Sequence, residues 1–470
     1  MGALGLGGLA VFLGQLNATA LPGGSGDDGG VAAGPDVIVG ALPDISAYAP
    51  AVWQGVTYCA YAVGTTSCNI GNQQLLWEPN PATTHPVMPQ NLYRVKNGVI
   101  KQIGQSWIKH GFCALQGTLC GACTPAGGGC PTVLGVGCSD PYSSGLNGGQ
   151  GDLKSRYGVN AATGVYSGTY SDPAIPSGYP SSIRERITVP KNDLDSTMNA
   201  GAQYFIEGQY VQVQDAAAGN DNNNASYRKV TVGTTYSTST GYSLTLTGAT
   251  FQQIPAIYAW QSVHSDVAIR EYDVAGDGRF IVGSRVTLNT DGTYHYSYNV
   301  FNLNSDRNGG SFSVPIATGV VLTNIAYSAP FNHSGDTYTN VPWTATQAGG
   351  SITWACEPNT NANAHAIRWS TMHTFEFDAN SAPTDASQIL TLGIWKAPTA
   401  SSTATSISVQ GKKPLPVAPP CADADLDCNG SVDGADLAAL LSCWGIACGD
   451  VNGDNLTDGA DLGIMLSAWN

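Results

Sequence analysis

The chain has 470 residues, of which 34 are acidic and 19 are basic, and its formal net charge is −15. No stripe of lysine and arginine runs along the sequence, which excludes the basic footprint that nucleic-acid binding needs. Charged residues make up only 11% of the chain, whereas glycine alone contributes 58 residues. This composition is typical of a secreted β-protein rather than a cytosolic helical one.

The first 35 residues are predicted to hold a targeting segment and a spacer. Residues 1–20 contain the apolar run GALGLGGLAVFLG and then Ala18-Thr19-Ala20, a small-x-small cleavage signal. A basic region before the run is missing, so we expect a signal peptide that is truncated at its start; a buried strand is the alternative. Residues 21–35 are Gly-rich and expected to be mobile. No other run reaches transmembrane length.

Twelve cysteines indicate an oxidising compartment. Seven lie between residues 59 and 138, four lie in the C-terminal tail, and Cys356 stands alone between them. Because seven is odd, Cys356 is expected to pair with one of the N-terminal group, although the sequence leaves the pairing open. Cys120 and Cys123 have the spacing of a redox dithiol. They lie among glycines rather than at a helix start, so structural disulfides are expected.

The body, residues 36–396, is predicted to be mainly β. Residues 36–190 are expected to form a cysteine-rich β and loop region, and residues 191–396 an antiparallel β-sandwich. The clearest signal is a hairpin that joins Ser284–Leu288 to Thr293–Phe301 through a turn at Asp291 and Gly292. Helical periodicity is confined to NDLDSTMNAGAQYF, which starts at Asn192.

Several side chains of the body are candidates for chemistry. His85 and His110, with a carboxylate such as Asp140, would suit a copper or zinc site. Glu207 lies between aromatic residues, where its pKa can rise, but a salt-bridged or edge-strand glutamate is the preferred interpretation. His365 and His373 are expected to lie too far apart to be neighbours, and His373 is expected to be a hydrogen-bonded core residue. No catalytic residue is therefore assigned.

Tyr294, Tyr296 and Tyr298 alternate along one predicted strand. Such a ladder on an exposed sheet face would stack on sugar rings, which makes a glycan one candidate partner. A core face, or the seam between two sandwich layers, is the preferred alternative.

The body also resembles a family of secreted bacterial proteins with no assigned chemistry. The similarity rests on four stretches: QNLYRVKNG (90–98), SWIKHGF (106–112), CSDPYSSGLNG (138–148) and AAAGNDNNNASYR (216–228). It implies an extracellular compartment and no activity.

Residues 397–420 are rich in Ser, Thr and Pro and are expected to form an extended, poorly packed linker. The tail, 421–470, follows with nine Asp and no Glu, Lys or Arg. It contains two twelve-residue loops, DLDCNGSVDGAD and DVNGDNLTDGAD, that repeat at a spacing of 25. Oxygen-bearing side chains occupy the first, third, fifth, ninth and twelfth places of each loop, a pattern that wraps Ca²⁺.

Both loops are therefore predicted to bind Ca²⁺. The first-loop ligands are Asp425, Asp427, Asn429, Ser431 through its backbone carbonyl, Asp433 directly or through water, and Asp436. The second-loop ligands are Asp450, Asn452, Asp454, Leu456 through its carbonyl, Asp458 and Asp461. The sharp turn at the sixth place falls on Gly430 in the first loop and Asn455 in the second, so the second site is expected to be weaker.

Each loop precedes an apolar stretch, DLAALLSCW or DLGIMLSAW. Leu437, Leu440, Leu441 and Trp444 have helical spacing and predict one amphipathic helix. This arrangement resembles a type I dockerin, and within that family the compact C-terminal repeats of secreted planctomycete-type proteins. The resemblance covers only residues 421–470. It implies calcium, an extracellular or cell-surface location, and a cohesin-like partner read near Gly434-Ala435 and Gly459-Ala460; a structural calcium clip without a partner is the alternative.

Three functions remain open at this point. The leading hypothesis is a secreted, non-catalytic binding or structural protein that is tethered through its calcium repeats. The second is an extracellular polysaccharide-active enzyme with a dockerin-like tail, which requires two facing carboxylates or a histidine cluster. The third is a subunit of a surface fibre or layer, which requires a free sheet edge.

Overall fold

The computed structural model describes residues 32–79, 82, 85–166, 172–417 and 423–470. The protein is mainly β, with antiparallel sheets and few helices, which confirms the predicted fold class. The predicted signal peptide and residues 21–31 lie outside the described residues. Over the described residues, no helix combines the length and the apolar character that crossing a membrane requires.

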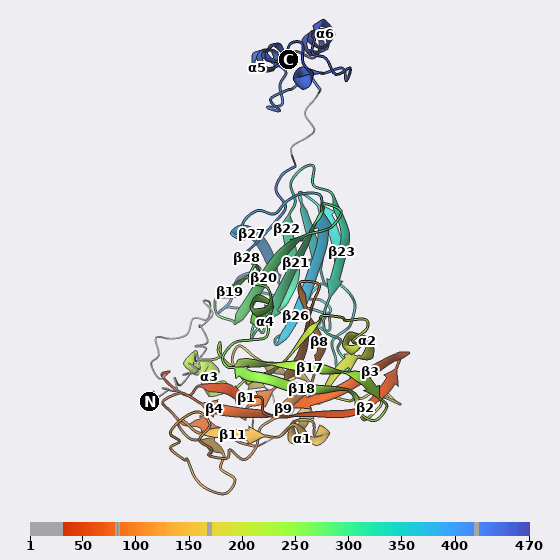
Figure 1. Ribbon diagram of the computed structural model, residues 1–470. Helices are drawn as coiled ribbons and strands as arrows, with labels where there is room; N and C mark the ends of the chain where they lie inside the picture. The colour runs from red at the N-terminus through yellow and green to blue at the C-terminus, as the bar shows by residue number, and fades with distance from the viewer. Residues whose placement is uncertain (1–31, 80–81, 83–84, 167–171, 418–422) are drawn as a thin grey trace, which may run out of the picture.

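The first body is built on an eight-stranded antiparallel sheet with the order β18-β17-β16-β7-β8-β15-β3-β2. It lies at the bottom of Figure 1. The strands are β2 (Ile45–Trp53), β3 (Val56–Val63), β7 (Gln90–Lys96), β8 (Val99–Gln105), β15 (Ile187–Pro190), β16 (Gln203–Gln209), β17 (Ala225–Ser237) and β18 (Gly241–Phe251).

Small sheets and short helices pack beside this sheet. Their strands are β1 (Val37–Ala41), β4 (Thr65–Asn69) and β11 (Ser139–Tyr142); β5 (Leu75–Leu76) and β10 (Val133–Leu134); β6 (Val87–Met88), β9 (Ile108–His110) and β12 (Leu153–Lys154); and β13 (Val159–Asn160) and β14 (Val165–Tyr166). The helices are α1 (Ser144–Asn147), η1 (Gln150–Asp152), η2 (Arg156–Gly158), α2 (Lys191–Leu194) and α3 (Val213–Ala218). Val39, Leu75, Leu134 and Ile206 belong to the core that joins these layers.

The second body is a β-sandwich of two five-stranded antiparallel sheets. One sheet contains β19 (Ala268–Asp273), β20 (Arg279–Leu288), β21 (Tyr294–Asn302), β26 (Thr371–Ala379) and β23 (Leu322–Ser328). The other contains β24 (Thr344–Ala348), β25 (Ser351–Ala355), β22 (Gly309–Pro315), β27 (Gln388–Ile394) and β28 (Ser406–Gly411). The core between them is aromatic, with Tyr298, Phe312, Trp354, Phe375 and Phe377 fully or nearly fully buried.

Strand β20 contacts both bodies, because its successive side chains point to opposite faces of the sheet. Phe280 and Val282 face the sandwich core, whereas Ile281 between them belongs to a second cluster. That cluster also contains Tyr93 of β7 and Trp260 of α4 (Tyr258–Val263). Both faces of the β20-β21-β26 sheet are therefore covered, one by the other sandwich sheet and one by the eight-stranded sheet and α4.

The predicted division near residue 190 is wrong. Strands from both sides of it share one sheet, because β16 (Gln203–Gln209) pairs with β7 (Gln90–Lys96). The chain passes into the sandwich only after β18, through α4. The predicted helical stretch is also wrong in most of its length, since α2 is a single turn, Lys191–Leu194, and Gln203–Gln209 is the central strand β16.

The predicted linker over 397–420 is wrong for residues 406–411, which form strand β28 and pair with β27. Val409 is fully buried in the sandwich core, and Ile407 packs against that core. The hairpin prediction is confirmed, because β20 and β21 pair from Leu288 and Tyr294 outward.

The expected bond between Cys356 and an N-terminal cysteine is wrong, because Cys59 and Cys356 are both free. Cys59 is buried on β3 in the first body, while Cys356 follows β25 in the sandwich. The prediction of structural disulfides is confirmed, since Cys120 bonds to Cys68 and Cys123 bonds to Cys138. A further bond joins Cys113 to Cys130.

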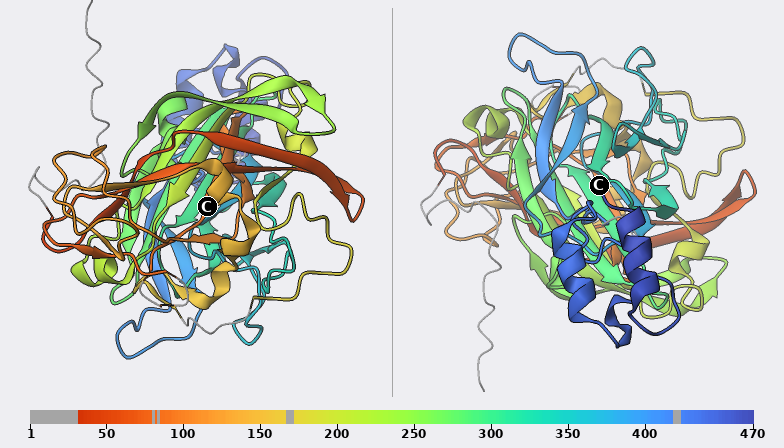
Figure 2. Two further views of the ribbon diagram at one scale, coloured as in Figure 1. Left: turned by 90° about the horizontal axis from the view of Figure 1, so that it is seen from below. Right: turned by 90° about the horizontal axis from the view of Figure 1, so that it is seen from above.

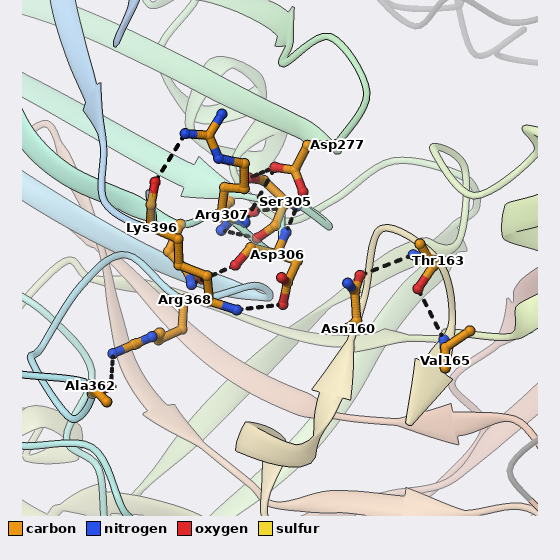
Figure 3. Close-up of polar contacts among 12 residues, drawn as sticks. Asn160, Thr163, Val165, Asp277, Ser305, Asp306, Arg307, Ala362, Arg368 and Lys396 are labelled. Atoms are coloured by element: carbon orange, nitrogen blue, oxygen red, sulfur yellow. Dashed lines mark hydrogen bonds and ion pairs between the residues drawn. The ribbon is translucent and has the colours of Figure 1, made fainter. Parts of the chain in front are cut away.

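Polar contacts hold the loops at the end of the sandwich (Figure 3). The Asp277 carboxylate accepts hydrogen bonds from the backbone N–H groups of Asp306 at 3.1 Å and Arg307 at 3.3 Å. Lys396 Nζ lies 2.8 Å from Asp306 Oδ1. These contacts tie the connection before β22 to the connection after β27.

The tail forms two helices, α5 (Gly434–Ser442) and α6 (Gly459–Ser467), with η3 (Ala447–Gly449) between them. The two helices lie side by side in Figure 2. Leu440 of α5 and Met465 of α6 share a small buried cluster with Ala424 and Val432.

Candidate metal centre

Each tail loop ends in an aspartate-capped helix. Asp433 is the N-cap of α5, and its side chain accepts a hydrogen bond from Ala435 N. The Asp436 carboxylate in turn accepts one from Asp433 N. Asp458 and Asp461 form the same reciprocal capping box at α6. The ninth and twelfth places of both loops thus start the helices, a role that Asp fills well even before any ion is considered.

The first loop gathers three carboxylates. Asp425, Asp427 and Asp436 each offer one oxygen, and these atoms all lie within 4.8 Å of one another. Asp425 and Asp436 are buried, whereas Asp427 is exposed. Because Ca²⁺ takes six to eight oxygen ligands, three carboxylates at this spacing fit part of its coordination shell.

Backbone N–H groups fix the directions of these carboxylates. Asp425 accepts from Asn429 N at 3.1 Å and Gly430 N at 3.0 Å, and Asp436 accepts from Asp427 N at 3.0 Å and Asp433 N at 2.9 Å. The Asn429 carboxamide oxygen accepts from Ser431 N at 2.9 Å. The N–H groups lower the pKa of Asp436, so its charge is retained at neutral pH.

The second loop repeats this scheme. Asp450 accepts from Gly453 N at 2.7 Å and Asn455 N at 2.6 Å. Asp461 accepts from Asp458 N at 2.8 Å, and backbone bonds of this kind lower its pKa. Within the loop, Asn452 Oδ1 accepts a hydrogen bond from Asp454 N, and Asp454 Oδ1 accepts one from Leu456 N, each at 2.9 Å.

The sixth place of each loop has the backbone conformation that the sequence predicted. Gly430 has a φ of 90° and Asn455 a φ of 72°. Both lie in the left-handed region, where glycine is free of strain and asparagine is tolerated. The asparagine of the second loop therefore adopts the required turn at some conformational cost.

The predicted apolar face of α5 is wrong in part. Leu440 is fully buried and Leu437 packs against it, but Leu441 is 51% exposed and Trp444 is 49% exposed. The second repeat exposes the corresponding residues, Leu466 and Trp469. Trp444 and Trp469 lie beyond the helices, which end at Ser442 and Ser467, so the helical spacing predicted for Trp444 does not apply to it.

The body brings His85 and His110 together. Their ring centroids are 4.3 Å apart, and His85 Nε2 meets His110 Nδ1. The Tyr166 hydroxyl lies 2.5 Å from His85 Nδ1. Burial lowers the pKa of His85 to about 4 and that of His110 to about 2, so both rings are neutral at pH 7.

Asp140 does not complete this pair. Its Oδ1 accepts a hydrogen bond from Leu115 N at 2.9 Å, and it forms no group of metal-ligand spacing with His85 and His110 among the described residues. Among the described residues, the tail aspartates are the one group of three or more His, Cys, Asp or Glu side chains with metal-ligand spacing. The predicted histidine–carboxylate site is therefore reduced to a pair of neutral imidazoles.

Glu207 is neither an edge residue nor part of an ion pair, contrary to the preferred interpretation. It lies fully buried on β16 in the middle of the eight-stranded sheet. Burial raises its pKa. Its carboxyl group accepts from Tyr93 Oη at 2.8 Å, Asn91 Nδ2 at 2.9 Å and Ala256 N at 2.6 Å. The contacts with Tyr93 and Asn91 lie within the eight-stranded sheet, and the contact with Ala256 N joins that sheet to the segment that leads into α4.

The other histidine and tyrosine predictions have mixed outcomes. His365 and His373 are neighbours after all, with ring centroids 5.1 Å apart, because the chain between them turns before β26. His373 is a buried core residue that is hydrogen-bonded to Tyr327 at 2.9 Å, as predicted. Tyr296 and Tyr298 are fully buried in the sandwich core, so they offer no sugar-stacking surface.

Comparisons with known proteins show no family. No family model and no curated protein matches the chain. The solved structures found include the exo-chitosanase CsxA of Amycolatopsis orientalis, alone and as its E541A complex with PNP-beta-D-glucosamine. Each is 8% identical, covers 74% of this chain and has a TM-score of 0.15. The chain spans 25% of the length of those proteins.

The buried Asp140 should make stability depend on pH. Burial raises its pKa to about 7 in the folded protein, whereas an unfolded aspartate titrates near about 3.9. The folded state therefore binds more protons between these values, and stability should fall as pH rises through this window. Asp140→Asn should make that decline shallower, measured as melting temperature from pH 4 to 7.5 in constant calcium.

The control for this prediction is Asp423→Asn, which changes an exposed aspartate of the tail and should keep the wild-type slope. A slope unchanged in Asp140→Asn would show that this carboxyl group is already ionised in the folded protein at acidic pH.

Proposed function

We propose that this protein is a secreted, non-catalytic binding or structural component that is tethered through a calcium-folded C-terminal module. The observation that carries the proposal is the cluster of Asp425, Asp427 and Asp436 oxygens within 4.8 Å. Two unit charges about 4 Å apart repel by roughly 1 to 4 kcal/mol at a solvated protein surface. Bound Ca²⁺ converts this repulsion into attraction, so its binding energy becomes folding energy of the module.

The first loop is the tighter of two calcium sites in this proposal. Backbone strain does not separate the loops, because Gly430 replaces Asn455 at the sixth place but Cys428, with a φ of 60°, replaces Gly453 at the fourth. The assignment rests on the three-carboxylate cluster, which is found in the first loop. Affinities in the range of extracellular calcium modules, about 10⁻⁴ to 10⁻³ M, would suffice outside the cell.

The four described disulfides support an extracellular location, because such bonds persist in oxidising compartments. One of them, Cys443–Cys448, closes the connection after α5. This bond and calcium would together stabilise a module whose apolar core is small, as is usual for domains of this size.

Docking through the tail is supported by its exposed apolar residues. Seven of the 21 large apolar side chains exposed among the described residues belong to the tail, about a tenth of the chain. Leu441 with Trp444, and Leu466 with Trp469, repeat at the spacing of the loops. Exposed tryptophans of this kind are frequent anchors of protein interfaces. We propose a cohesin-like module as the partner.

The double variant Asp425→Ala and Asp436→Ala should abolish calcium binding at the first loop and leave the tail unfolded. In the full chain, hydrogen exchange of residues 425–461 should then be fast with or without calcium, while the wild type is protected only with calcium. Asp423→Ala, which removes an exposed charge beside the loop, should behave as wild type. Equal protection of wild type in calcium and in chelator would refute the calcium-folded module.

The two loops should differ in affinity. Isothermal titration of calcium into the full chain should resolve a tighter and a weaker site, because the three-carboxylate cluster lies in the first loop. Asp450→Ala should remove the weaker site and Asp425→Ala the tighter one. If Asp450→Ala removes the tighter site instead, the assignment of the stronger loop is reversed.

The exposed tryptophans should determine docking. Trp444→Ser with Trp469→Ser should weaken binding to purified cohesin modules by a factor of about 100, which corresponds to roughly 2 to 3 kcal/mol for two interface anchors. Biolayer interferometry in calcium measures this, with calcium affinity as the check that the module still folds. Ile389→Ser, an exposed apolar change on β27, serves as control. Unchanged cohesin binding after both serine substitutions would contradict the proposal that these tryptophans form the docking surface.

A further inference from the structure

A cleft lies between the β7–β8 hairpin of the first body and the sandwich sheet that contains β20, β21 and β26. Its volume is about 400 Å³, within the range of ligand pockets. Lys96 and Lys101 come from the hairpin, and Thr287, His295 and Glu376 come from the sandwich. Domain junctions of this kind are frequent ligand sites because two rigid walls meet there.

The walls of the cleft are held in place from both sides. Gln102 of β8 accepts a hydrogen bond from Met372 N at 2.6 Å through its Oε1. Met372 lies on β26, and Trp260 of α4 donates from Nε1 to Gly98 O at 2.8 Å in the turn of the hairpin. The cleft is therefore preformed and needs no large rearrangement to accept a ligand.

The hairpin places three cations on one face. Arg94 and Lys101 are directly opposite each other on β7 and β8, and Lys96 lies two residues after Arg94 on the same face. All three line the cavity. Like charges directly opposite on neighbouring strands repel, so this arrangement is unfavourable unless anions face it.

Protein carboxylates neutralise two of these cations. Arg94 Nη1 lies 2.7 Å from Asp193 Oδ1, and Lys101 pairs with Glu376. The Lys96 ammonium donates to the Met198 carbonyl oxygen at 2.6 Å and makes no ion pair with a described residue. Lys96 is therefore the cation left for a ligand. It is one of only 19 basic residues in a chain of net charge −15.

The remaining lining groups are amides, a hydroxyl, and a histidine held between two carboxylates. Asn97, Thr287 and Asn289 contribute amides and a hydroxyl. His295 lies 2.7 Å from Asp378 Oδ1 and 3.3 Å from Glu376 Oε1. No Trp, Tyr or Phe among the described residues lines the cavity, so a ligand there is held by charge and hydrogen bonds rather than by ring stacking.

We propose that this cleft binds a saccharide that carries an anionic group, with the carboxylate of a uronic acid as the group that faces Lys96. A sugar supplies hydroxyls that both donate and accept, which matches the amides, the hydroxyl and Glu376 on the opposite wall. A uronate supplies the charge that an uncharged sugar lacks. This inference rests on the proposed binding role of the body and is independent of calcium binding by the tail.

The test uses the full chain and a trimer of galacturonic acid as probe, with a neutral galactose trimer, a sulfated galactose trimer and inorganic sulfate as comparisons. Isothermal titration at low and high salt should show binding of the uronate that weakens with salt, and little binding of the neutral sugar. Lys96→Glu should weaken uronate binding at least tenfold, and Lys229→Ala on the same sheet should leave it unchanged.

Preferential binding of the sulfated trimer would support an anionic saccharide and identify the ester as its charged group. Equal binding of the neutral trimer, equally tight binding of inorganic sulfate, or Lys96→Glu without effect would overturn the proposal. Repeating the titration on the Asp425→Ala and Asp436→Ala variant separates this outcome from failure of the tail. A functional cleft should bind the uronate equally well in that variant.

Discussion

The repulsion among three carboxylates of one twelve-residue loop is the constraint on which the C-terminal module depends. Asp425, Asp427 and Asp436 are brought within 4.8 Å by backbone N–H groups and by the start of α5. The apolar cluster behind them has only four buried members, too few to offset much unfavourable electrostatics. A divalent cation is the simplest way to balance this charge, and it would couple the order of the tail to calcium outside the cell.

The body is held together by apolar packing, because one sheet of the sandwich packs against the first body with its outer face. The β20-β21-β26 sheet packs on the sandwich core with one face and on the seam with the other. Glu207 and Asn91 tie that seam with buried hydrogen bonds, including one from Asn91 Nδ2 to Ser370 O at 3.1 Å. Such a junction holds the cleft beside Lys96 in a fixed shape, which fits the binding role proposed for the body.

Local patterns predicted local structure well. The loop spacing, the left-handed turns at Gly430 and Asn455 and the β20–β21 hairpin all follow from a few neighbouring residues. Long-range pairing was not predictable. The boundary near 190 failed because β16 inserts beside β7, and the linker failed because Ser and Thr mask the alternation of Ile407 and Val409 in β28. The contact of His85 with His110 likewise depends on how separate loops meet.

The most direct measurement of the central claim is the metal content of the purified full chain. Protein dialysed to equilibrium against calcium well above about 10⁻³ M should hold close to two calcium ions per chain in excess of the dialysate by elemental analysis, and magnesium should not replace them. A chain that carries no calcium under these conditions, yet shows the same ordered tail, would contradict the account.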